Sequence, residues 1–159
     1  MSVTVRLEGF AELERELERL GREATQKASL RRALKTSAEP MAAIARSLAP
    51  NDPATGAPDL ANSIAVSTKL SKRQRSQHRR MFRDDRASVE MFVGPGPDPA
   101  AWNQEFGNIN HRAQPFMRPA WDQDKDAMLD RLKREIWNDI QRTVARAARR
   151  AAAQAARGS

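Results

Sequence analysis

The sequence predicts an α+β fold in which an antiparallel sheet of three or more strands packs against two or three helices, with a long C-terminal helix. Three observations lead to this prediction. Short segments around positions 5, 65 and 91 alternate apolar and polar side chains, which is the period of half-buried strands. Longer segments repeat apolar residues at spacings of three and four, as amphipathic helices do. The length of 159 residues suits one domain. We assign residues 1–145 to it and residues 146–159 to an Ala/Arg-rich helical extension.

The first predicted element is a strand over residues 3–8, where Val3, Val5 and Leu7 alternate with polar side chains. The apolar spacing then changes to three and four, and glutamates fill the opposite face. This pattern predicts an amphipathic helix over residues 10–21.

A second helix is predicted over about residues 26–48, with many alanines to favour it. Pro40 lies inside this segment, and proline removes one helical hydrogen bond and clashes with the preceding turn. We therefore expect a kink there, or two shorter helices end to end. The proline-rich residues 49–59 are predicted as a loop, and strands are predicted over residues 62–70 and 89–93.

The connection between these two strands is strongly basic. Residues 69–86 hold eight bases against Asp84 and Asp85, a net charge of +6, within a chain whose total is +8. Because like charges repel and cannot all be buried, we expect an extended, poorly packed hairpin tip or insertion. Residues 142–159 add five arginines and no acid. A polyanion, an acidic protein surface or the negative end of a partner would complement these segments.

Residues 105–121, which we call the aromatic loop, hold Phe106, Phe116 and Trp121 together with two prolines. Proline fixes its own φ and restricts the residue before it, so the segment is stiff. Stiff aromatic segments suit interfaces. The alternative is that these aromatics close the core, which is the usual fate of such residues. The sequence leaves both interpretations open for Phe116 and Trp121.

A short amphipathic turn is predicted over residues 99–106, before the loop. The last helix is predicted to begin at Pro119 or Ala120, and its apolar stripe runs to Val144. Asp122 is a candidate N-terminal cap for it.

The sequence offers little for catalysis. It contains no cysteine, which excludes a disulfide, a thiolate metal site and a cysteine nucleophile. His78 and His111 are its two histidines, and the pairing of His111 with Glu105 is a weak acid–base candidate. We therefore predict no enzyme and no catalytic, cofactor-binding or metal-binding residues. Because no segment approaches the ~20 apolar residues of a membrane span, we expect a soluble protein made in a cytoplasm.

The order of motifs resembles a known family, the small neck or tail-completion proteins of long-tailed phages and of gene transfer agents, of the lambdoid minor tail protein Z type. The resemblance extends over nearly the whole chain, and its last block is the most specific. The blocks are Val5-Arg6-Leu7-Glu8-Gly9-Phe10-Ala11-Glu12-Leu13, then Leu48-Ala49-Pro50 with Thr55-Gly56, Leu60 and Ser63-Ile64, and finally Glu105-Phe106-Gly107 with Gln114-Pro115-Phe116-Met117-Arg118-Pro119-Ala120.

This resemblance implies a structural virion protein with no small-molecule substrate, no cofactor and no membrane partner. It implies a ring at the head–tail junction, or neck, that completes the tail and joins it to the head. Sixfold tail symmetry implies a hexamer, whose partners are connector or stopper, tail-terminator or tail-tube proteins, assembled in the bacterial host cytoplasm. The candidate subunit or partner interface comprises Phe106, Gly107, Pro115, Phe116, Arg118, Pro119 and Trp121.

A second hypothesis belongs to another class. In it the protein binds nucleic acid without sequence specificity through residues 69–86 and 142–159, because these segments are basic while stacking aromatics and a recognition helix are lacking. Contact with packaged DNA is compatible with the neck hypothesis too. The candidate DNA-facing residues are Lys69, Lys72, Arg73, Arg75, Arg79, Arg80, Arg83 and Arg86.

Overall fold

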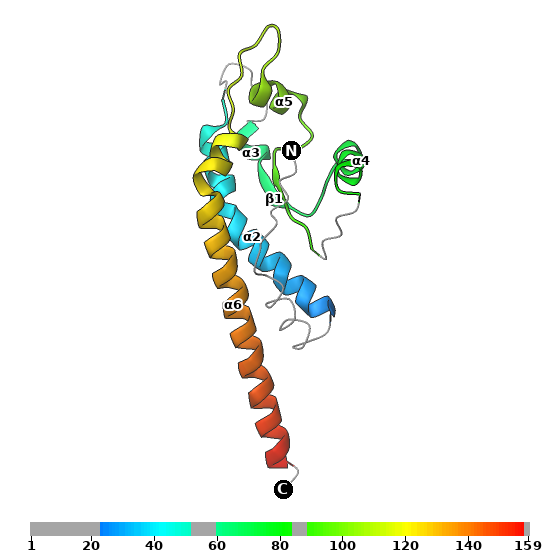
Figure 1. Cartoon of the computed structure of the whole chain (residues 1–159), viewed down its shortest axis with the longest axis vertical. Coiled ribbons are helices and arrows are strands. Elements are labelled where there is room, and N and C mark those ends of the chain that lie inside the picture. The colour runs from blue at the N-terminus through cyan, green and yellow to red at the C-terminus, as the bar shows by residue number, and fades with distance from the viewer. Residues whose placement is uncertain (1–22, 52–59, 84–88, 158–159) are drawn as a thin grey trace.

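A computed structural model describes residues 23–51, 60–83 and 89–157, and these are mostly helical with a small two-stranded antiparallel sheet. The long helices α2 (Glu23–Leu48) and α6 (Met117–Arg157) lie side by side and antiparallel (Figure 1). The shorter elements gather where α2 ends and α6 begins. The strand predicted over residues 3–8 and the helix predicted over residues 10–21 lie outside the described residues, so a third strand is not shown.

Helix α2 runs without interruption through Pro40, so the prediction of two shorter helices was wrong. Proline leaves the carbonyl of Thr36 without its helical donor. The helix persists because its following turn is held by packing, since Met41, Ala42 and Ala45 are buried against the rest of the core. Tertiary packing of this face outweighs the local effect of proline.

The sheet is shorter than predicted. Strand β1 (Ala65–Ser67) pairs antiparallel with β2 (Phe92–Gly94), and Val66 lies opposite Val93. The predicted strand start at residue 62 was wrong, because Leu60–Ser63 form a helical turn, α3, in which the Ser63 hydroxyl donates to the Leu60 carbonyl. That turn buries Leu60 and directs Ile64 into the core.

The basic connection between β1 and β2 is a helix, α4 (Lys72–Met81), and the prediction of an extended conformation was wrong there. Ser71 and Gln74 form a capping box. The Gln74 N–H donates to the Ser71 hydroxyl at 3.2 Å and the Ser71 N–H donates to the Gln74 side chain at 2.9 Å, so two backbone donors at the start of α4 are satisfied despite the charge repulsion. The prediction of poor packing is confirmed, because α4 has no buried residue. In Figure 1, α4 stands to one side of the long helix pair.

Helix α5 (Pro99–Phe106) matches the predicted short turn, with Asp98 as its N-cap and Pro99 at its first position. Helix α6 begins at Met117, two or three residues before the predicted start, and continues unbroken to Arg157. The predicted extension from residue 146 is therefore a continuation of the same helix. In the described part of the chain, no helix has the length and apolar character to cross a membrane.

Two apolar clusters join α2 to α6. The larger lies where the short elements gather, and the smaller lies further along the helix pair. Alanines at 0% exposure allow the two backbones to approach closely in the larger cluster. Its members are Ala38, Met41, Ala42, Ala45, Leu60, Ile64, Val66, Ala101, Phe116, Met117 and Ala120, and those of the smaller cluster are Ala33, Leu132, Ile136 and Ile140.

A polar contact separates the two clusters. The Arg131 guanidinium donates two hydrogen bonds, of 3.2 and 3.1 Å, to the carbonyl of Ser37 on α2. It also donates to the carboxylate of Asp124, which is only 6% exposed. The buried carboxylate of Asp124 is thus paired with Arg131. The Ser37 carbonyl, next to that of Thr36, gains a charged hydrogen-bond donor. This contact fixes the register of α2 against α6.

We expect Arg131→Leu to lower the free energy of unfolding by about 3 kcal/mol, because it leaves Asp124 buried and unpaired. Urea denaturation at neutral pH measures this loss. Lys125→Ala is the matched control, since Lys125 pairs with Asp122 at 3.7 Å on the exposed face of α6, and it should change stability by about 0.5 kcal/mol at most. Equal effects of the two substitutions would contradict the structural role assigned to Arg131.

Candidate functional site

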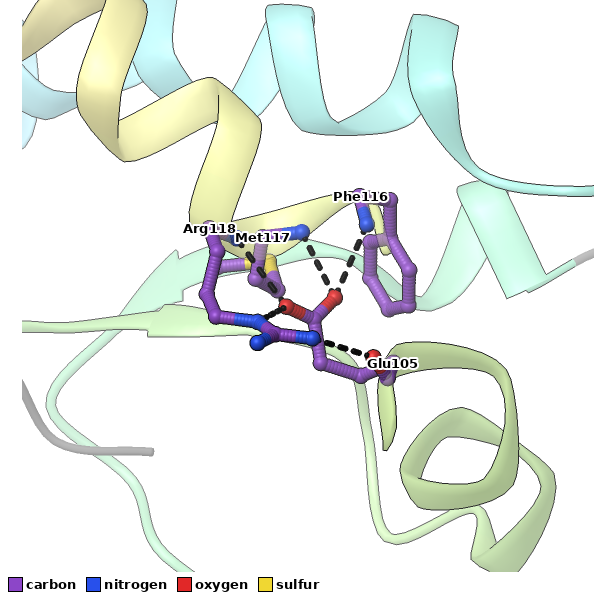
Figure 2. Close-up of polar contacts among 4 residues, drawn as sticks. All are labelled: Glu105, Phe116, Met117 and Arg118. Atoms are coloured by element: carbon purple, nitrogen blue, oxygen red, sulfur yellow. Dashed lines mark hydrogen bonds and ion pairs between the residues drawn. The ribbon is translucent and has the colours of Figure 1, made fainter. Parts of the chain in front are cut away.

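Glu105 connects the two ends of the aromatic loop. It is the penultimate residue of α5 and is only 3% exposed. Its carboxylate accepts hydrogen bonds from the backbone N–H groups of Phe116, Met117 and Arg118, at 2.8, 2.9 and 3.1 Å (Figure 2). One side chain therefore caps the N-terminus of α6 from across the loop, where its negative charge also complements the helix dipole.

This remote cap completes the hydrogen bonding of the first turn of α6. Residues 113–116 are Ala, Gln, Pro and Phe, so no side chain of the usual capping types stands next to the helix start. Pro119 has no N–H group to satisfy. The next donor, Ala120, reaches the Phe116 carbonyl at 3.3 Å. Every backbone donor of this turn is therefore accounted for.

Arg118 closes the same network from the solvent side. Its Nε donates to Glu105 Oε1 at 2.9 Å, and its Nη2 donates to the Glu105 carbonyl at 2.7 Å (Figure 2). Its guanidinium carbon also lies 4.9 Å from the centre of the Phe106 ring, a cation–π contact. Arg118 thereby joins the end of α5 to the start of α6.

Burial raises the pKa of the Glu105 carboxyl, but the bonds from the Phe116, Met117 and Arg118 backbones and from the Arg118 side chain outweigh that effect. The pKa therefore lies below its ordinary value of 4.5. The folded state therefore favours the ionised carboxylate of Glu105. The stability that this carboxylate contributes is fully present above the ordinary pKa of 4.5 and is lost as the pH falls through the lowered pKa.

The loop between the two ends is folded tightly back on α5. Gly107 has a φ of 75°, and a Cβ there would lie 2.8 Å from the Ala113 nitrogen. Asn108 and His111 exchange backbone hydrogen bonds of 2.9 and 3.2 Å. Gln104 accepts the Gln114 N–H at 2.7 Å, and its side chain bonds to the His111 ring at 2.9 Å. Only glycine fits this turn without strain.

Apolar side chains are exposed on and beside this fixed loop. Ile109 is 99% exposed, Trp102 on α5 is 64% exposed and Phe106 is 40% exposed. The rings of Trp102 and Phe106 lie 4.4 Å apart, so they form one aromatic surface. We call these three residues the apolar tip.

The predicted interface residues divide between surface and core. Phe116 is completely buried and packs in the larger cluster, and Trp121 is half-buried against it. Pro115 and Arg118 are exposed, and Gly107 and Pro119 are half-buried. Phe106 is partly exposed, and Arg118 joins it to the network of Glu105.

Sequence reasoning missed three features here. The capping role of Glu105 went unrecognised, although the lack of a local cap before α6 was a signal for it. The exposure of Trp102 was not anticipated. Asp122 is not the N-cap, because α6 begins five residues earlier and the Asp122 side chain is 71% exposed. His111 bonds to Gln104 rather than to Glu105, and no cluster of metal-ligating side chains occurs among the residues with a described position.

Five of the candidate DNA-facing residues lie on α4, and Lys69 and Arg83 flank it. Those described are all exposed, while Arg86 lies outside the described residues. The side chains that line an open hollow of about 410 Å³ are Lys72, Arg75, Ser76, Arg79, Arg80 and Arg83.

The C-terminal arginines lie apart from α4, on the part of α6 that follows Ile140. Ile140 is the last buried residue of this helix, and Arg142, Arg146, Arg149 and Arg150 are exposed. Trp137 and Val144 are 56% and 48% exposed. Because seven residues span about two turns, both lie on one side of α6. We call these two residues the helix patch.

Comparison with known families gives one match. The model of the HK97-gp10-like family, described as "Bacteriophage HK97-gp10, putative tail-component", matches residues 11–107. No curated protein and no solved structure matches the chain.

We expect Glu105→Gln to lower the free energy of unfolding by about 2–3 kcal/mol at pH 7, because the amide loses the charge that three N–H donors and Arg118 share. Glu39→Gln is the control, since Glu39 pairs with Arg46 at 2.8 Å with 48% of its side chain exposed, and should cost about 0.5 kcal/mol at most. The difference between wild type and Glu105→Gln should shrink as the pH falls below the ordinary value of 4.5. A difference independent of pH would contradict the ionised cap.

Gly107→Ala should destabilise the protein by about 1–3 kcal/mol, because the new Cβ is forced into a positive φ and against the backbone of Ala113. Gly94→Ala is the matched control, since no atom lies within 4 Å of a Cβ at that position. Thermal unfolding of both variants measures the difference. Similar melting temperatures for the two variants would show that the loop is not constrained as described.

Proposed function

The chain belongs to the HK97-gp10-like family of phage tail components, and we propose that it forms a ring at the head–tail junction, completing the tail and joining it to the head. Membership makes it a structural component of the virion. The ring and its place in the neck are the proposal, and the observation that carries it is the apolar tip, held rigidly by the Glu105 network.

Rigidity is what makes the apolar tip suitable for assembly. A flexible loop would lose conformational entropy on binding, whereas this loop is already ordered by the cap on α6 and the turn at Gly107. Its exposed aromatic and aliphatic side chains resemble the anchors that dominate binding energy at interfaces. Arg118, next to Phe106, belongs to the same class of interface residue.

The helix patch offers a second, different surface. Residues 141–157 of α6 extend past the last buried residue, and at ~1.5 Å per residue they form about 25 Å of helix. Figure 1 places α5 and the C-terminus at opposite ends of the long axis. Two unlike patches at separate places on one subunit suit a heterologous, head-to-tail contact, and such contacts close into rings when the rotation allows. Sixfold tail symmetry makes the proposed ring a hexamer.

In the proposed contact, the apolar tip of one copy meets the helix patch of the next. The remaining faces of the ring are left for the connector or stopper, the tail terminator or the tail tube. This arrangement differs from an isologous dimer, in which each patch would meet its own equivalent. The difference can be tested by mixing variants.

We expect Ile109→Asp and Val144→Asp each to prevent ring formation while leaving the monomer folded, because both side chains are exposed in the monomer. Loss of a buried aliphatic contact, about 1.5–3 kcal/mol, weakens each interface by roughly 10–100-fold. A mixture of the two variants should form heterodimers but no rings, since each partner keeps one intact patch. Native mass spectrometry, with and without tail-tube and connector proteins, distinguishes monomer, heterodimer and ring.

Met81→Asp is the control, because Met81 is 70% exposed on α4, away from both patches, and should leave assembly unchanged. Two results would overturn the proposal. One is wild-type protein that stays monomeric in every mixture. The other is a mixture of Ile109→Asp and Val144→Asp that forms no heterodimer.

A further inference from the structure

We propose that the outer face of α4 binds the phosphate backbone of double-stranded nucleic acid without reading its sequence. This inference does not rest on the ring. It rests on the contacts between α4 and β2, on the charges that α4 presents and on the hollow that these charged side chains line.

One face of α4 is anchored to the sheet. His78 lies with 14% of its side chain exposed, its ring 4.9 Å from that of Phe82 and 5.2 Å from that of Phe92 on β2. It also lies 3.5 Å from the Glu90 carboxylate. The capping box of Ser71 and Gln74 fixes the first turn on the same side. These contacts join one face of α4 to β2, although no residue of α4 is buried.

The opposite face consists almost entirely of cations. Lys72, Arg75 and Arg79 follow one another at spacings of three and four, so they form a row along the helix, and Arg83, just past the end of α4, lines the same hollow. Arg80 lies beside this row and shares its hollow of about 410 Å³. All are exposed, and across the described ranges of the chain no carboxylate forms an ion pair with any of them. The hollow accordingly offers convergent donors to an anion.

Arg79 and Arg80 in the last turn complement the dipole of α4, but the cations at its start do not serve its stability. Lys72 and Arg73 lie in its first turn, where cations oppose the helix dipole, and the first turn contains no acid. Neighbouring arginines three and four residues apart repel one another. A surface that departs from local stability rules without a structural gain is characteristic of a functional site.

Duplex nucleic acid fits this face better than an acidic protein surface does. B-DNA carries one negative charge per ~1.7 Å of its axis, and the ten residues of α4, at ~1.5 Å each, present four of the five cations of the hollow over about 15 Å, with Arg83 just past the helix end. Arginine and lysine are the residues that contact phosphates. The proposal assigns these cations to phosphates, and the exposed side chains of α4 that could in addition accept a hydrogen bond from a base edge are Ser76 and Gln77.

The test measures binding of the full chain to two 30-base-pair duplexes of unrelated sequence. If five cations neutralise five phosphates, the affinity should fall roughly 500-fold between 50 and 200 mM salt, and both duplexes should bind within about threefold of each other. Arg75→Gln/Arg79→Gln/Arg80→Gln should reduce that fall to roughly tenfold. Its melting temperature should be unchanged or higher, because the substitution removes repulsion on α4.

The control is Arg142→Gln/Arg146→Gln/Arg149→Gln, which removes the same charge from α6 and should preserve the salt dependence. If both triple variants lost the salt dependence of binding to the same extent, net charge alone would drive binding, and the assignment of the site to α4 would be overturned. Undetectable or salt-insensitive binding by the wild type at 50 mM would overturn it too. A third arm uses polyglutamate. Affinity equal to that for the duplex, lost on the same α4 substitutions, would assign this face to an acidic protein surface instead.

Discussion

The buried carboxylate of Glu105 is the interaction on which the rest of the structure depends. It accepts from three consecutive backbone N–H groups at the start of α6, so it fixes where that helix begins and how α5 meets it. The position of Phe116 follows directly, because its own N–H is one of the three donors and its ring fills the centre of the larger cluster. The core and the aromatic loop are thus ordered by one charge. Removing water from that charge is tolerated because its hydrogen bonds replace those of the solvent.

The same interaction explains how apolar side chains can stay exposed. Ile109 would collapse toward the core if its backbone were free, since burial of apolar surface is favourable. Here the backbone is closed at both ends, by the cap on α6 and by the turn at Gly107. The loop therefore displays apolar surface at a defined place. A defined exposed surface is a requirement for assembly into a closed, symmetric ring.

Local patterns in the sequence were enough to predict α5, the bounds of the second helix and a long last helix, because periodicity and capping residues are local signals. These local patterns failed where contacts with residues distant in the sequence determine the conformation. The extent of α2 through Pro40 depends on packing and on Arg131, which is far away in sequence. The start of α6 depends on Glu105, on another helix. The conformation of the basic segment was misjudged because repulsion was weighed without the capping box at Ser71. Aromatics and prolines singled out the aromatic loop in the sequence, but the structure alone separates buried Phe116 from exposed Phe106.

The two proposals reinforce each other through symmetry. The apolar tip and the helix patch lie on the long helix pair and its end, whereas α4 stands to one side of that pair. Ring closure through the first two surfaces therefore need not cover α4. In a closed ring every copy of α4 lies at the same radius, so phosphate contacts that are weak and salt-sensitive for one copy act together on a single duplex. Such linkage raises avidity by increasing the effective concentration of each further contact. Because none of these contacts reads a base, the duplex remains free to slide past them, which is what passage of DNA through a tail neck requires.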